Sequence, residues 1–267
     1  MNKILFSAAF FLVSSLVQAA PEVEKDIQLE VFASGEAKGF NTLYKGKTYT
    51  ASLNADRLLT VQPMEDGKAV GKPLVLHFGV SETEGGRGER LDLLKLDKKP
   101  KPAIQPKKIE IVGTCEDKLR FELEMGFSEN AVTVQGEMRK GGGKRQHVLL
   151  GYHVRFPATH VLPESASPEL IAKETDGSML SLTGQAMPSQ TAKFSQIVSS
   201  VHGVEKAVVT GSWGARKLTL EMEKSKEVKH PGTFWNYAAT ALYKGGWALG
   251  RAAVDKAPGG PLVLRIE

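Results

Sequence analysis

The feature that most constrains the fold is an alternation of apolar and polar residues, which dominates residues 108–157. Apolar side chains occupy most alternate positions in the segments 119–125, 132–138 and 148–156. Successive side chains of a strand point to opposite faces, so this period of two is typical of strands with one buried and one wet face. Short connections rich in glycine and polar residues separate the segments. With residues 108–112 in front, the pattern predicts a four-stranded antiparallel meander.

Shorter runs of the same kind, separated by turn residues, occur on both sides of this region. They cover residues 27–32, 49–53, 58–62, 74–78, 91–96, 179–182, 207–210, 218–222, 247–254 and 262–266. Many short strands at regular spacing are typical of a sandwich or barrel. We predict an all-β antiparallel sandwich, either one large sandwich or two closely packed ones, with at most one or two short helices. A helix competes with a strand in two places, after Thr191 and after Thr233.

The first nineteen residues have the pattern of a secretory signal peptide. Asn2 and Lys3 precede an apolar run over residues 4–16, and Val17-Gln18-Ala19 places small residues where a signal peptidase requires them. We expect cleavage after Ala19 and export to a periplasm or to the outside of the cell. No later segment is long and apolar enough for a transmembrane helix.

A stretch rich in proline and lysine, residues 98–107, divides the remaining chain. Such a stretch is extended and stiff. We expect an N-terminal β unit over residues 20–97, and the meander with a C-terminal β unit over residues 108–267. The alternative is one continuous sandwich in which 98–107 joins two strands.

An internal repeat is a further expectation, since residues 67–76 resemble residues 255–264 and weaker matches precede both. If 27–79 and 218–267 are equivalent units, Pro73 and Pro261 each open a strand, because proline is tolerated at a strand's first residue. The residues expected in the core are Leu74, Leu76, Phe78, Leu262, Leu264 and Ile266. His77 and Arg265 are expected to point away from it.

Composition and motifs exclude several classes of function. The single cysteine, Cys115, leaves no intrachain disulfide and no cysteine-based zinc site. The formal net charge of +5 comes from scattered basic residues, without the basic stripe that nucleic-acid binding needs. No serine-nucleophile, zinc-helix or phosphate-loop motif is present. We therefore assign no catalytic residue, no metal ligand and no cofactor, and we expect no nucleic-acid partner.

Two groups of residues are candidate sites. The first is a polar face of the predicted meander, formed by Glu124, Glu137, His147, His153 and Arg155. A glutamate and a histidine on one face suit acid–base chemistry, although the wet side of an ordinary sheet gives the same pattern. The second group is aromatic and consists of Trp213, Trp235, Tyr237, Tyr243 and Trp247. These rings suit stacking on sugars, and the alternative is that they are core residues.

Three segments, Phe121–Met125, Ala131–Glu137 and Val148–Pro157, resemble the galactose-mutarotase-like β-supersandwich. They share its strand rhythm, which ends in an apolar-Arg-Phe-Pro element at residues 154–157. The resemblance implies the same fold and an association with carbohydrate, because such modules accompany exported enzymes that degrade polysaccharides. No catalytic motif of the family matches, so no catalytic residue is carried over.

Three hypotheses of function follow. The first is an exported, non-catalytic β-sandwich that binds a carbohydrate or a cell-envelope partner. The second is a glycan-acting enzyme that uses the charged sheet face. The third is a structural or assembly protein that pairs with a partner through exposed edge strands.

Overall fold

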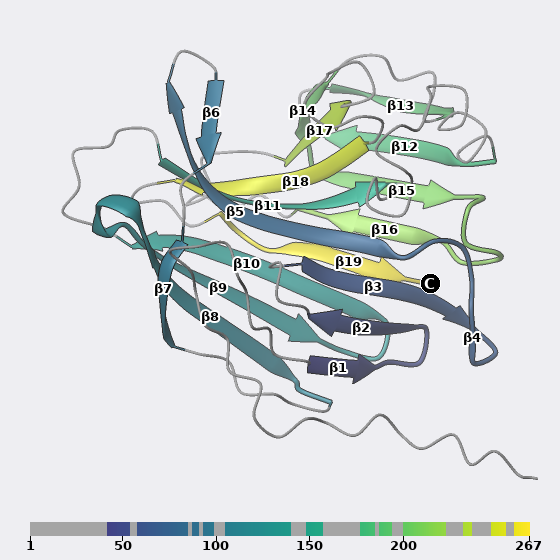
Figure 1. Cartoon of the computed structure of the whole chain (residues 1–267). Coiled ribbons are helices and arrows are strands. Elements are labelled where there is room, and N and C mark those ends of the chain that lie inside the picture. Colours follow the sequence, from purple (N-terminus) through teal and green to yellow (C-terminus); the bar gives the residue numbers. More distant parts are fainter. Residues whose placement is uncertain are drawn as a thin grey trace, which may run out of the picture.

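The computed structural model describes residues 42–53, 58–84, 87–90, 93–98, 105–139, 148–156, 177–184, 187–193, 200–222, 232–236, 247–254 and 259–267. This part of the chain forms strands β1 to β19 and one short 3-10 helix, η1 (Glu116–Lys118). The strands make two antiparallel sheets that pack face to face (Figure 1). The predicted all-β antiparallel sandwich is confirmed. In the described residues, no helix is long and apolar enough to cross a membrane.

The first sheet has ten strands and includes the first six described strands of the chain. Its order is β1 (Thr42–Lys45), β2 (Tyr49–Leu53), β3 (Leu58–Glu65), β5 (Leu74–Glu84), β11 (Val148–Phe156), β18 (Trp247–Val254), β17 (Gly232–Asn236) and β14 (Val201–Val204). Two short strands lie off this path, because β4 (Lys68–Ala69) pairs with β3 and β6 (Arg87–Arg90) pairs with β5.

The second sheet has nine strands. Its order is β13 (Met187–Lys193), β12 (Met179–Gly184), β15 (Lys206–Thr210), β16 (Leu218–Glu221), β19 (Leu262–Ile266), β10 (Ala131–Arg139), β9 (Arg120–Phe127), β8 (Lys108–Cys115) and β7 (Leu93–Lys98). Strand β19, the last in the sequence, therefore lies between β16 and β10 near the middle of the sheet (Figure 1).

One apolar core fills the space between the two sheets. On β9, Leu123 and Met125 are fully buried, and on β11 Leu150 and Val154 are fully buried as well. Residues between them on each strand point away from the core, and we call these positions outward. Because burial of apolar surface is the main favourable term in folding, the alternation in the sequence decides which side of each strand faces inward.

The predicted four-stranded meander is correct for its first three strands only. Strands β8, β9 and β10 are hydrogen-bonded neighbours, whereas β11 lies in the other sheet between β5 and β18. Its partner across the core is β10, where Gly136 makes room, since a Cβ added there would lie 2.7 Å from the Leu150 side chain. The alternation of apolar and polar residues shows which face of a strand is buried. It is the same for two strands paired in one sheet and for two strands that face each other across the core, so it does not identify a strand's neighbour.

Strands from both sides of residues 98–107 are interleaved. In the ten-stranded sheet β5 pairs with β11, and in the nine-stranded sheet β7 pairs with β8. The proline- and lysine-rich stretch is thus no boundary between sheets.

The expected repeat predicts two single strands correctly, but the two segments that contain them are not equivalent units. Strands β5 and β19 begin directly after Pro73 and Pro261, and their predicted core residues are buried. However, β5 pairs with the strand before it, β3, whereas β19 pairs with β16 and β10 and lies in a different sheet from β17 and β18. Residues 27–79 and 218–267 are therefore not equivalent units.

Both places where a helix competed with a strand begin as strands. Thr191 lies within β13 and Thr233 within β17. Residues 194–199 and 237–246 lie outside the described part of the chain, as does the predicted signal peptide.

Buried polar groups hold the segment that leads into β19. The Tyr152 hydroxyl donates to the Gly260 carbonyl, and Arg251 Nη1 donates to the Pro261 carbonyl at 3.0 Å. Arg251 is only 2% exposed. Since a buried charge is tolerated only with hydrogen-bond partners, these contacts tie the crossing from the ten-stranded to the nine-stranded sheet to one geometry.

Candidate ligand-binding face

The candidate site lies on the outward face of the ten-stranded sheet, where a row of polar residues crosses its strands. His77 on β5 is the register partner of His153 on β11, which in turn lies opposite Gly250 on β18. Gly250 lies opposite Thr233 on β17, and Thr233 opposite His202 on β14. We call these five residues the histidine row. Antiparallel pairing places register partners on the same face, so residues far apart in sequence meet here.

A second row runs beside the histidine row, two residues away from it on each strand. It contains Val75, Arg155, Ala248 and Trp235. Val75 and Ala248 are completely buried although they point outward, whereas Arg155 and Trp235 are half-buried. This part of the face is therefore shielded from bulk water more than an ordinary wet sheet face.

His153 is the centre of the contacts between the two rows. Its ring stacks on that of His77, with centroids 5.5 Å apart and planes within 7°. It also makes a T-shaped contact with the Trp235 ring, with centroids 6.0 Å apart. Arg155 Nε donates to His153 Nε2 over 3.4 Å. An imidazole nitrogen that accepts a hydrogen bond carries no proton, so this contact assigns the proton of the neutral ring to Nδ1.

The electrostatics agree with a neutral ring. Burial, and secondly the positive charge of Arg155, lower the pKa of His153 from 6.5 to about 3. Desolvation disfavours the charged imidazolium, and a neighbouring cation disfavours it further. At neutral pH the side chain is therefore a neutral donor and acceptor.

Small residues shape the surface around these rings. At Gly250 an added Cβ would lie 2.3 Å from His153 Cβ and from the Tyr152 carbonyl oxygen, so only glycine fits opposite His153. Because β18 carries only glycine and alanine here, the His153 and Trp235 rings meet across it. Gly79 on β5 and its register partner Gly151 on β11 form a third row on this face. A Cβ at Gly79 would meet nothing within 4 Å, and one at Gly151 only a carbonyl oxygen at 3.9 Å. The half-buried backbone of these glycines therefore has open space above it, beside the stacked imidazoles.

At the described outward positions of the central strands of this face, the permanent charge is positive only. Among the described outward positions of β5, β11, β17 and β18, Arg155 is the one permanently charged residue and no position holds a carboxylate. These four strands offer hydrogen-bond donors, two imidazole rings and an indole, and β14 adds the imidazole of His202. In the described residues, no group of three or more histidine, cysteine, aspartate or glutamate side chains is placed to hold a metal ion.

The predicted polar face is wrong as a single surface. His153 and Arg155 point outward from the ten-stranded sheet, whereas Glu124 and Glu137 point outward from the nine-stranded sheet, on the opposite side of the core. The cause is the crossing of the chain between β10 and β11. His147 lies outside the described residues.

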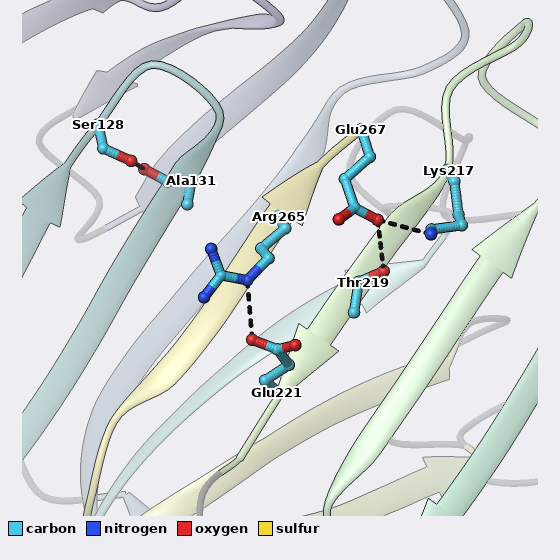
Figure 2. Close-up of polar contacts among 7 residues, drawn as sticks. All are labelled: Ser128, Ala131, Lys217, Thr219, Glu221, Arg265 and Glu267. Atoms are coloured by element: carbon cyan, nitrogen blue, oxygen red, sulfur yellow. Dashed lines mark hydrogen bonds and ion pairs between the residues drawn. The ribbon is translucent and has the colours of Figure 1, made fainter.

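Glu124 belongs to a ladder of paired charges on the nine-stranded sheet. Glu124 accepts from Lys108 Nζ at 2.6 Å, and Glu122 pairs with Arg139. Figure 2 shows the same arrangement on the neighbouring strands, where Arg265 Nε lies 2.8 Å from Glu221 Oε2. Glu267 accepts from Lys217 Nζ at 2.7 Å and from the Thr219 hydroxyl at 3.2 Å.

The predicted aromatic group is divided as well. Trp235 lies on the candidate face, but Trp213 is a core residue, 3% exposed, whose Nε1 donates to the Lys72 carbonyl at 2.7 Å. It fills the space beside Gly71, where an added Cβ would lie 2.6 Å from the indole. Trp213 is therefore no ligand-stacking residue. The side chain of Trp247 lies outside the described part of the structure, as do Tyr237 and Tyr243.

His77, Thr233 and His202 also belong to the site, although no motif in the sequence placed them there in advance. His77 was expected to point outward, but nothing local indicates that β5 pairs with β11. A signal was present in the sequence: His77 and His153 each lie at an outward position between two core residues of an apolar strand. Two such strands are candidates for neighbours in one sheet.

Comparisons with known proteins identify the fold. No family model matches the chain, and no curated protein matches it. Among solved structures, a galactose mutarotase-like protein from Lactobacillus casei is similar with a TM-score of 0.50 and 10% identity, over 85% of this chain and 99% of that one. The galactose-mutarotase-like fold expected from the sequence is thus confirmed, and likeness at this identity concerns the fold alone.

Two further structures are similar at lower scores. A galactose mutarotase related enzyme from Lactobacillus acidophilus has a TM-score of 0.46 and 6% identity, over 85% of this chain and 97% of that one. A protein from Synechocystis sp. has a TM-score of 0.47 and 8% identity, over 98% and 99% of the two chains.

Proposed function

We propose that the protein is an exported, non-catalytic carbohydrate-binding protein whose ligand lies on the outward face of the ten-stranded sheet. The observation that carries the proposal is the cluster of His77, His153, Arg155 and Trp235, drawn from three strands onto one face beside the open backbone at Gly79. The name of the Lactobacillus casei structure adds support, since a protein of the same fold is described as mutarotase-like.

The chemistry of the cluster suits a sugar. The apolar face of a pyranose ring stacks on an aromatic ring, and the half-buried Trp235 offers an indole. Hydroxyl groups need donors and acceptors with fixed directions, which a neutral imidazole and a guanidinium supply. A few polar groups fixed among small and apolar residues are the usual composition of a small-molecule site.

The export part of the proposal rests on residues 1–19. Their charged start, apolar run and small residues before the cut are typical of a secretory signal. Mass spectrometry of the protein from the extracytoplasmic fraction of its host tests this directly. We expect an N-terminus at Ala20, and an intact N-terminus in a cytoplasmic fraction would contradict it.

The binding part is tested with a glycan array followed by calorimetry on the best ligand. We expect Trp235→Ala to weaken binding by about tenfold, because an aromatic contact contributes roughly 0.5–1.5 kcal/mol beyond its buried area. Trp213→Phe is the matched control: it removes the hydrogen bond to Lys72 and lowers stability, but leaves the dissociation constant unchanged. A panel without any bound glycan would overturn the proposal.

The non-catalytic part has its own measurement. The bound glycan is incubated with the protein, and its products are followed by chromatography and its anomers by NMR. We expect no change beyond the uncatalysed rate, and faster turnover would replace the non-catalytic assignment with an enzymatic one.

A further inference from the structure

We propose that the edge of β1 is a strand-addition surface for a second copy of this chain, and that Gln105 occupies this edge in the monomer. The edge is the side of β1 that faces away from β2, and β1 is an end strand of the ten-stranded sheet among the described strands. The inference is independent of the proposed function, because it concerns the edge of this sheet and not its outward face.

The first step is the set of hydrogen bonds that Gln105 makes with β1. Its main-chain N–H donates to the Leu43 carbonyl at 2.9 Å. Its side-chain Oε1 accepts from the main-chain N–H of Lys45, and its Nε2 donates to the Lys45 carbonyl at 2.9 Å. The main-chain groups of an edge strand are a template for another strand. Gln105 thus supplies bonds that a neighbouring strand would otherwise supply.

The second step is which residues of β1 point to this edge. Within a strand, the N–H and the carbonyl of one residue point to the same side, and successive residues alternate between the two sides. The contacts with Gln105 show that Leu43 and Lys45 are directed away from β2. These two residues are therefore the ones that would pair with an added strand.

The third step is why the added strand is that of a second copy. An antiparallel pair of two β1 strands, related by a twofold axis at Tyr44, places Leu43 of each copy opposite Lys45 of the other. Each such pair exchanges both main-chain hydrogen bonds, and the two lysines do not face each other. The β1 edge is therefore complementary to itself, as a twofold interface requires.

The fourth step is that β1 stays in place when its edge is uncovered. It pairs with β2 over all 4 of its residues. The Tyr44 ring stacks on Phe127 of the opposite sheet, with centroids 5.3 Å apart. Just after β1, the Lys47 N–H donates to the Glu129 carbonyl at 2.9 Å. Since none of these contacts involves Gln105, loss of its side chain exposes an ordered strand.

The fifth step is a comparison with the other end strands of the two sheets. The pairing of β7, β13 and β14 with their neighbours is interrupted by register shifts. Irregularities of this kind make an edge a poor template for a further strand. The pairing of β1 with β2 has no shift. The regular edge is therefore the one that needs a cover, which Gln105 provides.

The experiment shortens the Gln105 side chain and measures the mass in solution. The φ of Gln105 is 55°, in the left-handed region where asparagine is enriched, so Gln105→Asn fits the backbone. Its side chain is shorter by a methylene and cannot bind both main-chain groups of Lys45. Over about a hundredfold range of concentration, we expect sedimentation to show a monomer for the unmodified protein and about twice that mass for concentrated Gln105→Asn.

Two further variants locate the interface. In the Gln105→Asn background, Leu43→Pro removes an N–H that points to the edge and is not bonded to β2, and proline is tolerated at such positions. We expect it to restore the monomer, because an added strand loses a donor and meets the proline ring. Gln135→Ala, at an exposed position of β10, is the matched control and leaves the mass unchanged. Thermal melting establishes that each variant is folded.

A measurement on the unmodified protein keeps the inference testable without any variant. We expect the Lys45 amide to exchange with solvent at least about tenfold more slowly than in an unstructured chain, because its N–H is bonded to Gln105. Exchange at the rate of an unstructured chain would show that Gln105 does not occupy the edge in solution, which overturns the inference.

The sedimentation results decide the rest. A folded Gln105→Asn that stays monomeric at the highest concentration overturns the inference, as does an unmodified protein that already forms dimers. Association of Gln105→Asn that Leu43→Pro leaves intact occurs elsewhere on the molecule and also overturns it. Association that Leu43→Pro abolishes and that Gln135→Ala does not induce supports it. Glycan binding is measured separately, so the proposed function stands or fails on its own.

Discussion

The two outward faces of the sandwich arise from the same alternating pattern but differ in how their side chains are satisfied. On the nine-stranded sheet, long charged side chains reach across strands and pair with one another, as Figure 2 shows for Arg265 with Glu221 and Lys217 with Glu267. On the ten-stranded sheet, rings stack, small residues leave backbone open, and Arg155 contacts an imidazole.

The difference separates a solvated surface from a candidate site. Exposed ion pairs contribute little to stability, and they cover a sheet face with charges that water also satisfies. A face with partly buried rings, a neutral histidine and glycines opposite bulky residues is more constrained. The polar character of a face is therefore less informative than the way its polar groups are partnered.

The largest effect is expected from a pair of outward glycines, one on each face. Gly250→Ala places a Cβ 2.3 Å from His153 Cβ and the Tyr152 carbonyl, so backbone or ring must shift. Gly126→Ala on β9 meets only Thr133 Cβ at 3.8 Å, an ordinary contact. We expect urea unfolding to show a loss of about 1–3 kcal/mol for Gly250→Ala and no loss for Gly126→Ala. Equal effects at both positions would remove the distinction between the faces.

A smaller effect is expected from the titration of His153. Its pKa is lowered to about 3 in the folded protein, so the unfolded chain binds a proton first as the pH falls. Stability from this group is complete above pH 6.5 and declines below it. Between pH 7 and pH 5.5 the unmodified protein is expected to lose about 1 kcal/mol that His153→Gln does not lose. NMR of the imidazole checks the cause, and a ring that titrates near pH 6 contradicts it.

The smallest effect is expected on the nine-stranded face. A double-mutant cycle of Arg265→Ala and Glu221→Ala measures the coupling of a half-buried pair 2.8 Å apart. We expect roughly 0.2–1 kcal/mol, which decreases when salt is added because mobile ions screen the charges. A coupling of several kcal/mol would show that this face is as constrained as the other one.

The fold class and the inward side of each strand were predictable from the sequence, since Phe121, Leu123, Leu150 and Val154 repeat with the period of a strand and are all buried. The pairing of strands joined by short turns was predictable, as for β8, β9 and β10, but the pairing of β11 was not. Strand β11 satisfies the same alternation whether it follows β10 in one sheet or faces it across the core, so the meander and the single polar face were wrong together.

The candidate site was predictable only in pieces. His153, Arg155 and Trp235 were identified by residue type, but their meeting depends on the register of β11, β18 and β17, which is fixed by pairings between distant segments. For Trp213 the sequence left two interpretations open, a ligand contact and a core residue, because an aromatic ring suits both, and its burial supports the second. Its burial follows from the close approach of Gly71, a contact between segments far apart in sequence.

The central place of β19 has a consequence for how the molecule is made. Until residues 262–266 have left the ribosome, β10 and β16 each have an unpaired edge, and the halves of the nine-stranded sheet have no common strand. Unpaired edges invite association with other chains. Completion of the sheet therefore waits for a strand that is synthesised after both of its neighbours, and a chaperone that shields nascent strands is expected to increase the yield of soluble protein.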